Sequence, residues 1–176
     1  MIGEGTFVNI SGVATTLARE RHVGKDQEVR ARFLGRLDKV MDETGPGNEL
    51  VNLLEGFKRD GIRMGIVSFM RRPRLLRRLE LWKLTSFFQA VVTPEQVSEF
   101  KPSPQPFLTA IRELKLRPAN CFVIGDEPVD MTGGKRAGTK TIGLPQGFFS
   151  ADELREAGAD RVVSSISLLP SVLKSP

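Results

Sequence analysis

Val123-Ile124-Gly125-Asp126-Glu127-Pro128-Val129-Asp130 is the stretch that decides the predicted fold, because a short apolar run passes directly into a polar cluster. A short apolar run is typical of a buried strand in a parallel sheet, whose two faces are both covered by helices. In such sheets ligands bind beyond the carboxyl ends of the strands, and Asp126 and Asp130 follow this run. The stretch therefore predicts an α/β fold and places a candidate site at one edge of its sheet.

The rest of the chain repeats this alternation of short β-rich runs and longer helical patterns, which favours a mostly parallel central sheet with helices on both faces. The expected strands are residues 6–10, 63–68, 89–92, 120–124, 139–142 and 161–163. The expected helices are residues 26–43, 48–59, 73–84 and 103–114, a short helix from Ser150 to Gly158, and residues 168–173. Without an internal repeat or a long linker, we expect one Rossmann-type α/β domain over residues 1–176, with residues 26–47 as a cap remnant or helical appendage.

The composition is that of a soluble globular domain, since 40% of the 176 residues are hydrophobic and 27% are charged. The single cysteine, Cys121, excludes an internal disulfide, and with His22 as the one histidine there is no Cys/His zinc cluster. Cys121 lies in an apolar run and is expected in the core. No run approaches the roughly 20 apolar residues of a membrane span, and no signal-peptide pattern opens the chain. We therefore expect a cytoplasmic protein with no membrane partner.

Polar residues also follow the other predicted strands. Asn9 and Ser11 end the first strand, Ser68 ends the second, and Lys101 lies in a Phe-Lys-Pro-Ser-Pro loop at residues 100–104. A lysine and a hydroxyl can neutralise or donate to phosphoryl oxygens, while carboxylates supply the oxygen ligands that Mg²⁺ prefers. The combination predicts a cleft for a phosphate group and Mg²⁺.

Each of these residues also has a structural interpretation. Asp126 and Asp130 are typical of a turn that begins a helix, and Ser68, with Phe69 after it, is typical of ordinary loop chemistry. Lys101 could be a solvated side chain. The order of the residues along the chain is what favours a common site.

That order resembles a known family. A hydroxyl at Ser68, Lys-Pro at residues 101–102 and Gly-Asp-x-x-x-Asp at residues 125–130 resemble motifs II, III and IV of the haloacid dehalogenase superfamily, especially its phosphoglycolate-phosphatase-like members. Residues 61–159 resemble these members nearly throughout. The resemblance implies that Ser68 hydrogen-bonds the phosphoryl group, that Lys101 stabilises its negative charge, and that Asp126 holds Mg²⁺ with Asp130 nearby.

Motif I is where the sequence departs from this family. The family reads Asp-x-Asp-Gly-Thr, in which the first aspartate attacks phosphorus and the second acts as general acid and base, whereas this chain reads Asn9-Ile10-Ser11-Gly12-Val13. An amide oxygen is a poor nucleophile, and a serine without an adjacent base cannot manage proton transfer near neutral pH. Asn9 and Ser11 can still offer oxygens to Mg²⁺, although one anionic ligand fewer lowers its affinity. The alternative is a chance alignment, with the true motif I upstream of this start.

A basic run at residues 71–78 carries five arginines and no acid, which equals the whole net charge of +5. Its simplest interpretation is the solvated face of a helix whose other face carries leucines. A functional alternative is that its first arginines flank the phosphate cleft, since arginine binds phosphate well. Because no nucleic-acid motif accompanies the run, a nucleic-acid partner is disfavoured.

Three functional hypotheses follow. The first is a phosphatase-like protein that keeps a cleft for phosphate or a phosphorylated small molecule, with weakened Mg²⁺ binding, and is inactive or regulatory. The second is an active hydrolase of a small or macromolecular phosphate ester with a non-standard site. The third and weakest is an anion- or nucleic-acid-binding module that uses the basic run. Since the cap is nearly absent, a protein partner that covers the open site is a further expectation.

Overall fold

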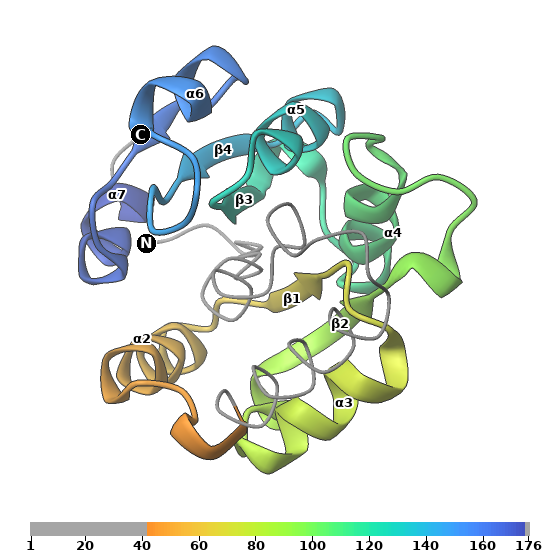
Figure 1. The fold of residues 1–176 in the computed structure, drawn as a ribbon, viewed down its shortest axis with the longest axis vertical. Coiled ribbons are helices and arrows are strands. Elements are labelled where there is room, and N and C mark those ends of the chain that lie inside the picture. Colours follow the sequence, from red (N-terminus) through yellow and green to blue (C-terminus); the bar gives the residue numbers. More distant parts are fainter. Residues whose placement is uncertain (1–41, 175–176) are drawn as a thin grey trace, which may run out of the picture.

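The computed structural model describes residues 42–174, in which strands and helices alternate along the chain (Figure 1). The strands are β1 (Met64–Val67), β2 (Phe88–Val92), β3 (Phe122–Gly125), β4 (Lys140–Gly143) and β5 (Arg161–Val162). The helices are α2 (Asn48–Arg59), α3 (Arg72–Leu81), α4 (Gln105–Glu113), α5 (Pro128–Arg136), α6 (Ala151–Glu156) and α7 (Leu169–Lys174). The expected strand at residues 6–10 and most of the expected helix at 26–43 lie outside the described residues, and so do Asn9 and Ser11.

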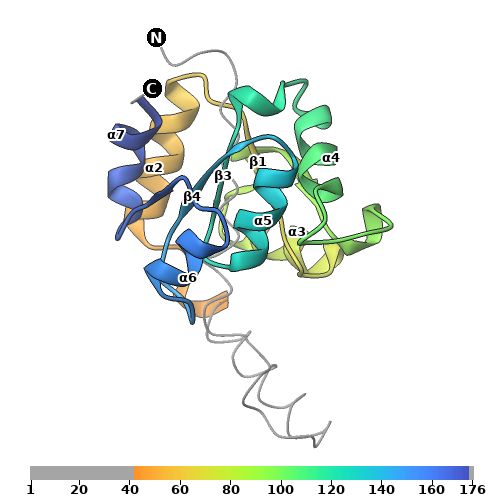
Figure 2. The ribbon, with the colours of Figure 1, turned by 90° about the horizontal axis from the view of Figure 1, so that it is seen from above.

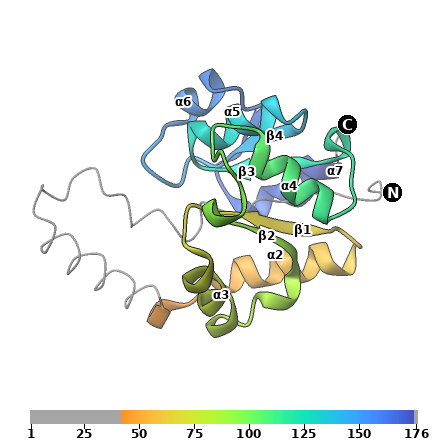
Figure 3. The same cartoon turned by 90° about the vertical axis from the view of Figure 1, so that its right-hand side faces the viewer.

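All strand pairs among residues 42–174 are parallel, as the sequence predicts. β1 pairs with β2, and β4 pairs with β3 on one side and β5 on the other. Figure 3 shows β1 and β2 between α2 and α4, which cover opposite faces. The predicted α/β class is therefore confirmed.

The hydrophobic core forms on both faces of the strands. On one face, Ile66 of β1 and Ile124 of β3 pack in one cluster with α2, α3 and α7, so this cluster joins the two paired sets of strands. On the other face, Val67 and Val123 pack with α4 and with the buried thiol of Cys121, which confirms Cys121 as a core residue. Figure 2 shows α2 and α7 together on one side and α5 on the other. Successive residues of β1 and of β3 thus point to opposite faces, as the pleat requires.

Helix α2 follows its predicted bounds because its sequence separates an apolar from a polar side. Its buried residues are Leu50, Leu53, Leu54 and Phe57, at the spacing of one helical face. Gly61 follows with φ +75°, the left-handed conformation that glycine adopts most easily after a helix. No helix of the described part of the chain is both long and apolar enough to cross a membrane.

The sequence did not predict helix α5, because two glycines weaken its helical pattern. The structure shows why they are there. A Cβ on Gly133 would lie 2.5 Å from Cε2 of Phe107, and one on Gly134 would lie 2.8 Å from Cγ2 of Thr141. The glycines therefore let α5 lie close to both α4 and the sheet.

Three predicted boundaries were also wrong by a few residues. Residue 120 belongs to a 3₁₀ turn (Pro118–Asn120) and not to a strand, because Pro118 begins a tight turn there. The helix expected at 73–84 ends at Leu81, before Lys83 adopts φ +57°. The helix expected from residue 103 begins at Gln105, after the turn in which Ser103 N donates to Phe100 O.

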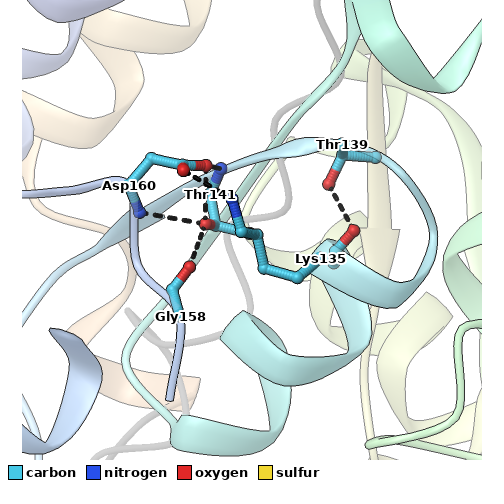
Figure 4. A network of polar contacts seen from close by, with 6 residues as sticks. Lys135, Thr139, Thr141, Gly158 and Asp160 are labelled. Carbon is cyan, nitrogen blue, oxygen red and sulfur yellow. Dashed lines mark hydrogen bonds and ion pairs between the residues drawn. The ribbon is translucent and has the colours of Figure 1, made fainter. Parts of the chain in front are cut away.

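The short strand β5 is fixed to β4 by the polar network of Figure 4. Asp160 Oδ2 accepts from Thr141 N at 2.8 Å, and Asp160 Oδ1 lies 2.5 Å from Lys135 Nζ. Thr141 Oγ1 donates to Gly158 O at 2.7 Å. Burial raises the pKa of Asp160, but the hydrogen bonds from Lys135 and Thr141 outweigh it and leave the pKa below its ordinary value. An ionised Asp160 therefore connects α5, β4 and β5.

Candidate functional site

The predicted site residues in the described part of the chain lie at the carboxyl ends of two strands. Ser68 directly follows β1, Asp126 directly follows β3, and Asp130 lies in the first turn of α5. Lys101 belongs to the loop before α4. All four are buried, which solvated loop residues would not be.

Lys101 and Asp130 form a buried ion pair. Lys101 Nζ lies 2.7 Å from Asp130 Oδ1, and the two side chains are 2% and 0% exposed. The carboxylate packs directly on Gly125, since a Cβ there would lie 2.5 Å from Asp130 Oδ2. The glycine of the Gly-Asp-x-x-x-Asp pattern is thus required by the carboxylate at its end, and the pair joins the lysine loop to the end of β3.

Three aromatic rings surround the same ammonium. Lys101 Nζ lies 5.2 Å from the ring centre of Phe69, 5.9 Å from that of Phe100 and 6.0 Å from that of Phe107. The rings of Phe69 and Phe100 meet edge to face, with centres 4.8 Å apart. Sequence reasoning missed these rings. Phe69 directly follows Ser68, and Phe100 directly precedes Lys101. Their position next to predicted site residues was the signal that the sequence offered.

Ser68 is held by backbone hydrogen bonds on both sides. Its N–H donates to Val92 O at 3.0 Å, and its Oγ accepts from Met70 N at 3.2 Å. A hydroxyl oxygen that accepts a bond can still donate its own hydrogen. The contact between Phe69 and Phe100 brings the segment after Ser68 against the Lys101 loop. Ser68 and Lys101 therefore belong to one neighbourhood.

Asp126 is covered by the loop that follows β4. Its side chain faces Gly147, where a Cβ would lie 2.7 Å from Asp126 Oδ2. The next residue, Glu127, is only 8% exposed and caps α5 with its carbonyl, which accepts from Asp130 N at 3.0 Å. Sequence reasoning missed Glu127 as a buried acid. The carboxylates gather where β3 ends.

The described residues include oxygen donors of the type that Mg²⁺ prefers. Asp126 offers carboxylate oxygens, the donor type that Mg²⁺ prefers. Asp130 gives one oxygen to Lys101. Within residues 42–174 no group of three or more His, Cys, Asp or Glu side chains is placed to hold a metal. The donor chemistry fits Mg²⁺, while Asn9 and Ser11, the other predicted ligands, lie outside the described residues.

The basic run is not the uniform solvated face that the sequence predicts. Arg78 is 4% exposed, and its Nε lies 2.9 Å from Asp42 Oδ1. Arg72 donates from Nη1 to Val91 O at 2.6 Å. The exposed arginines are Arg71, Arg74 and Arg77. Arg72 and Arg78 thus bond to other parts of the protein, because helix α3 packs on the core. The prediction of a solvated helix face was wrong for Arg78, which is buried.

A cleft of about 440 Å³ lies elsewhere, at the amino end of β4. Its lining includes Lys135, Thr139, Thr141 and Asp160, which Figure 4 shows in hydrogen bonds to one another or to nearby carbonyls. Parallel sheets bind ligands at the carboxyl ends of their strands, which is the opposite edge. The residues around Lys101 are therefore the better candidate site.

Curated relatives share sequence with much of this chain. Pyrophosphatase PpaX of Bacillus mycoides (strain KBAB4) is 34% identical over 134 residues, which are 76% of this chain and 61% of the relative. Pyrophosphatase PpaX of Bacillus cereus (strain B4264) is 38% identical over 107 residues, which are 61% of this chain and 48% of the relative. The chain thus spans about half to three fifths of the length of these relatives.

Solved structures share the fold. A candidate beta-phosphoglucomutase of Thermotoga maritima has a TM-score of 0.80 at 19% identity and covers 98% of this chain, with 100% of its own length matched. A HAD family hydrolase of Deinococcus radiodurans R1, with bound phosphate and sodium, has a TM-score of 0.73 at 24% identity and covers 92% of this chain, with 73% of its own length matched. At these identities the likeness concerns the fold.

The family model for haloacid dehalogenase-like hydrolases matches residues 7–144, which include every candidate site residue. The match covers well over half of the 176 residues. The matched range contains Ser68, Lys101, Asp126 and Asp130, whose order along the chain resembles the motifs of this family. The parallel α/β fold agrees with the match. The chain therefore belongs to the haloacid dehalogenase-like hydrolase family.

Proposed function

We propose that this protein binds phosphate or a small phosphorylated molecule at the site around Lys101, and that it has lost efficient hydrolysis. The observation that carries the proposal is the buried pair of Lys101 and Asp130, at 2.7 Å, beside the strand end that bears Ser68. A buried ammonium held at a fixed place is suited to an anion, because charge interactions strengthen where water is excluded.

The described residues have distinct roles in this proposal. Ser68 donates its hydroxyl hydrogen to a phosphoryl oxygen, and Lys101 neutralises the phosphoryl charge. Asp130 holds Lys101 in place, and Asp126 would hold Mg²⁺. When bound, Mg²⁺ supplies additional positive charge to a phosphate group. Hydrolases of this family generally use Mg²⁺, which supports the assignment of Asp126.

The loss of hydrolysis rests on motif I. The family match begins at residue 7 and so spans Asn9 and Ser11. The proposal assigns these two residues, by the resemblance of their motif, to the positions of the family's nucleophile and general acid. General acid–base catalysis alone contributes about 10²- to 10⁴-fold in rate, and the nucleophile is lost as well. A binding or regulatory role fits a protein that keeps the anion site without these groups.

An active phosphatase is the second candidate, favoured by the relatives that are named pyrophosphatases. Hydrolysis of an aryl phosphate and of pyrophosphate with Mg²⁺ separates the two. We expect no turnover above background for the natural chain and a gain of activity in Asn9→Asp/Ser11→Asp. Turnover that is abolished by Asp126→Ala would overturn the inactive assignment.

Binding of inorganic phosphate, measured by calorimetry, tests the site itself. The double variant Lys101→Met/Asp130→Asn removes both charges, and we expect it to weaken binding at least about tenfold, the scale of one charge-assisted hydrogen bond. Lys140→Met is the matched control, because Lys140 is exposed and lies at the amino end of β4. Equal binding by both variants would remove Lys101 from the site. A protein partner that covers the site stays a prediction.

A further inference from the structure

The surroundings of Lys101 contain more than its carboxylate partner. An ammonium has three N–H donors, and the described structure uses one of them for Asp130 Oδ1. Three phenylalanine rings lie with their centres 5.2–6.0 Å from Nζ. A ring attracts a cation through its quadrupole, and this attraction is strongest where the cation is shielded from water. Since the Lys101 side chain is 2% exposed, it meets that condition.

The three rings differ in their position relative to solvent. Phe107 is fully buried on α4, where it also packs against Gly133. Phe100 is half-buried and directly precedes Lys101. Phe69 is 49% exposed, although its ring is the nearest of the three to Nζ. Phe69 is therefore the ring that separates the ammonium from solvent.

Contacts on two sides hold Phe69 in this position. Its ring meets Phe100 edge to face at 63°, an arrangement that aromatic pairs favour. Its backbone directly follows Ser68, whose Oγ accepts from Met70 N. The segment of residues 68–70 thus places a hydroxyl and an aromatic ring together beside the same lysine.

We propose that Phe69 is a positioning residue for Lys101: its ring holds the ammonium in place and keeps water from it without occupying the hydrogens that a phosphoryl oxygen would accept. This inference rests on the proposed function, because it assigns those hydrogens to a phosphoryl group. Loss of the ring leaves Lys101 hydrated and mobile, and a mobile lysine binds an anion less well.

The test compares Phe69→Leu, which removes the ring and keeps an apolar side chain, with Phe69→Tyr, which keeps the ring. The control is Phe122→Leu, because Phe122 contacts Lys140 Nζ at a similar 5.3 Å and lies away from the site. Two readouts are used: the lysine side-chain carbon and proton NMR signals, with Lys101 assigned from Lys101→Arg, and calorimetric binding of inorganic phosphate.

In the natural protein, we expect ring currents from Phe69, whose ring centre lies 5.2 Å from Lys101 Nζ, to shift the Lys101 signals away from those of exposed lysines. We expect Phe69→Leu to move them toward the exposed values and to weaken phosphate binding about 2- to 30-fold, the range for one cation–π contact. Phe69→Tyr should retain the natural values of both. Phe122→Leu should move the Lys140 signals alone and leave phosphate binding unchanged.

The two readouts separate this inference from the proposed function. If the natural protein binds no phosphate, the proposed function fails, and the Lys101 signals alone decide whether Phe69 holds the lysine. Unchanged Lys101 signals in Phe69→Leu would overturn the inference. If the natural protein binds phosphate, a folded Phe69→Leu variant that binds phosphate with the same affinity would overturn it as well.

Discussion

The substitution Asp130→Asn tests the buried ion pair most directly. It keeps the shape of the side chain and removes its charge, so Lys101, 2% exposed, is left as a buried ammonium beside a neutral amide. Removing one partner of a buried pair costs about 3–5 kcal/mol, mainly through the charge left uncompensated. Because a domain of this kind is stable by about 5–15 kcal/mol, the variant should lose a large part of its stability.

The assay is urea unfolding followed by circular dichroism at pH 7. A second change, Lys101→Met, removes the uncompensated charge, so the double variant should regain most of the lost stability. Asp152→Asn is the control, since its pair with Arg155 has side chains 84% and 57% exposed and is worth at most about 1 kcal/mol. A loss below about 1 kcal/mol for Asp130→Asn, or no recovery in the double variant, would refute the reasoning.

Three further predictions concern the fold. Gly134→Ala should destabilise the protein by about 1–3 kcal/mol, because its Cβ would lie 2.8–2.9 Å from two side chains of the sheet. Gly56→Ala should stabilise the protein by up to about 1 kcal/mol, because the atom nearest to its Cβ would be 3.9 Å away. Urea unfolding of both variants measures the two effects. Folding lowers the pKa of Asp160. The ionised carboxylate therefore contributes to folding stability above the unfolded pKa of about 3.9, and this contribution is lost as the pH falls through the pKa of the folded state. Melting temperatures should therefore fall less between pH 7 and pH 2 in Asp160→Asn than in the natural protein, and equal slopes would count against this. Arg78→Gln should lower the melting temperature and Arg77→Gln should not, since Arg78 is buried in an ion pair and Arg77 is exposed.

Much of the site could be predicted because its chemistry lies in local sequence patterns. Strands of parallel sheets are buried and apolar, so a polar residue directly after such a run marks the sheet edge. This rule placed Ser68 and Asp126 correctly at strand ends, and the structure brings Lys101 to Asp130. Helix α5 was missed because its two glycines are unfavourable in a helix. They are needed because α5 lies close to α4 and to the sheet, and the sequence of the helix does not reveal that contact.

The sequence by itself determined the parallel α/β fold and the order of the site residues along the chain. These follow from periodicity and residue type, which are properties of neighbouring residues. Only the tertiary structure decided that Asp130 forms a buried ion pair with Lys101, that the Phe69 ring lies 5.2 Å from the same ammonium, and that Arg78 is buried against Asp42. Each of these contacts joins residues from different segments, and charge and ring interactions depend on distance and exclusion of water, which only packing sets.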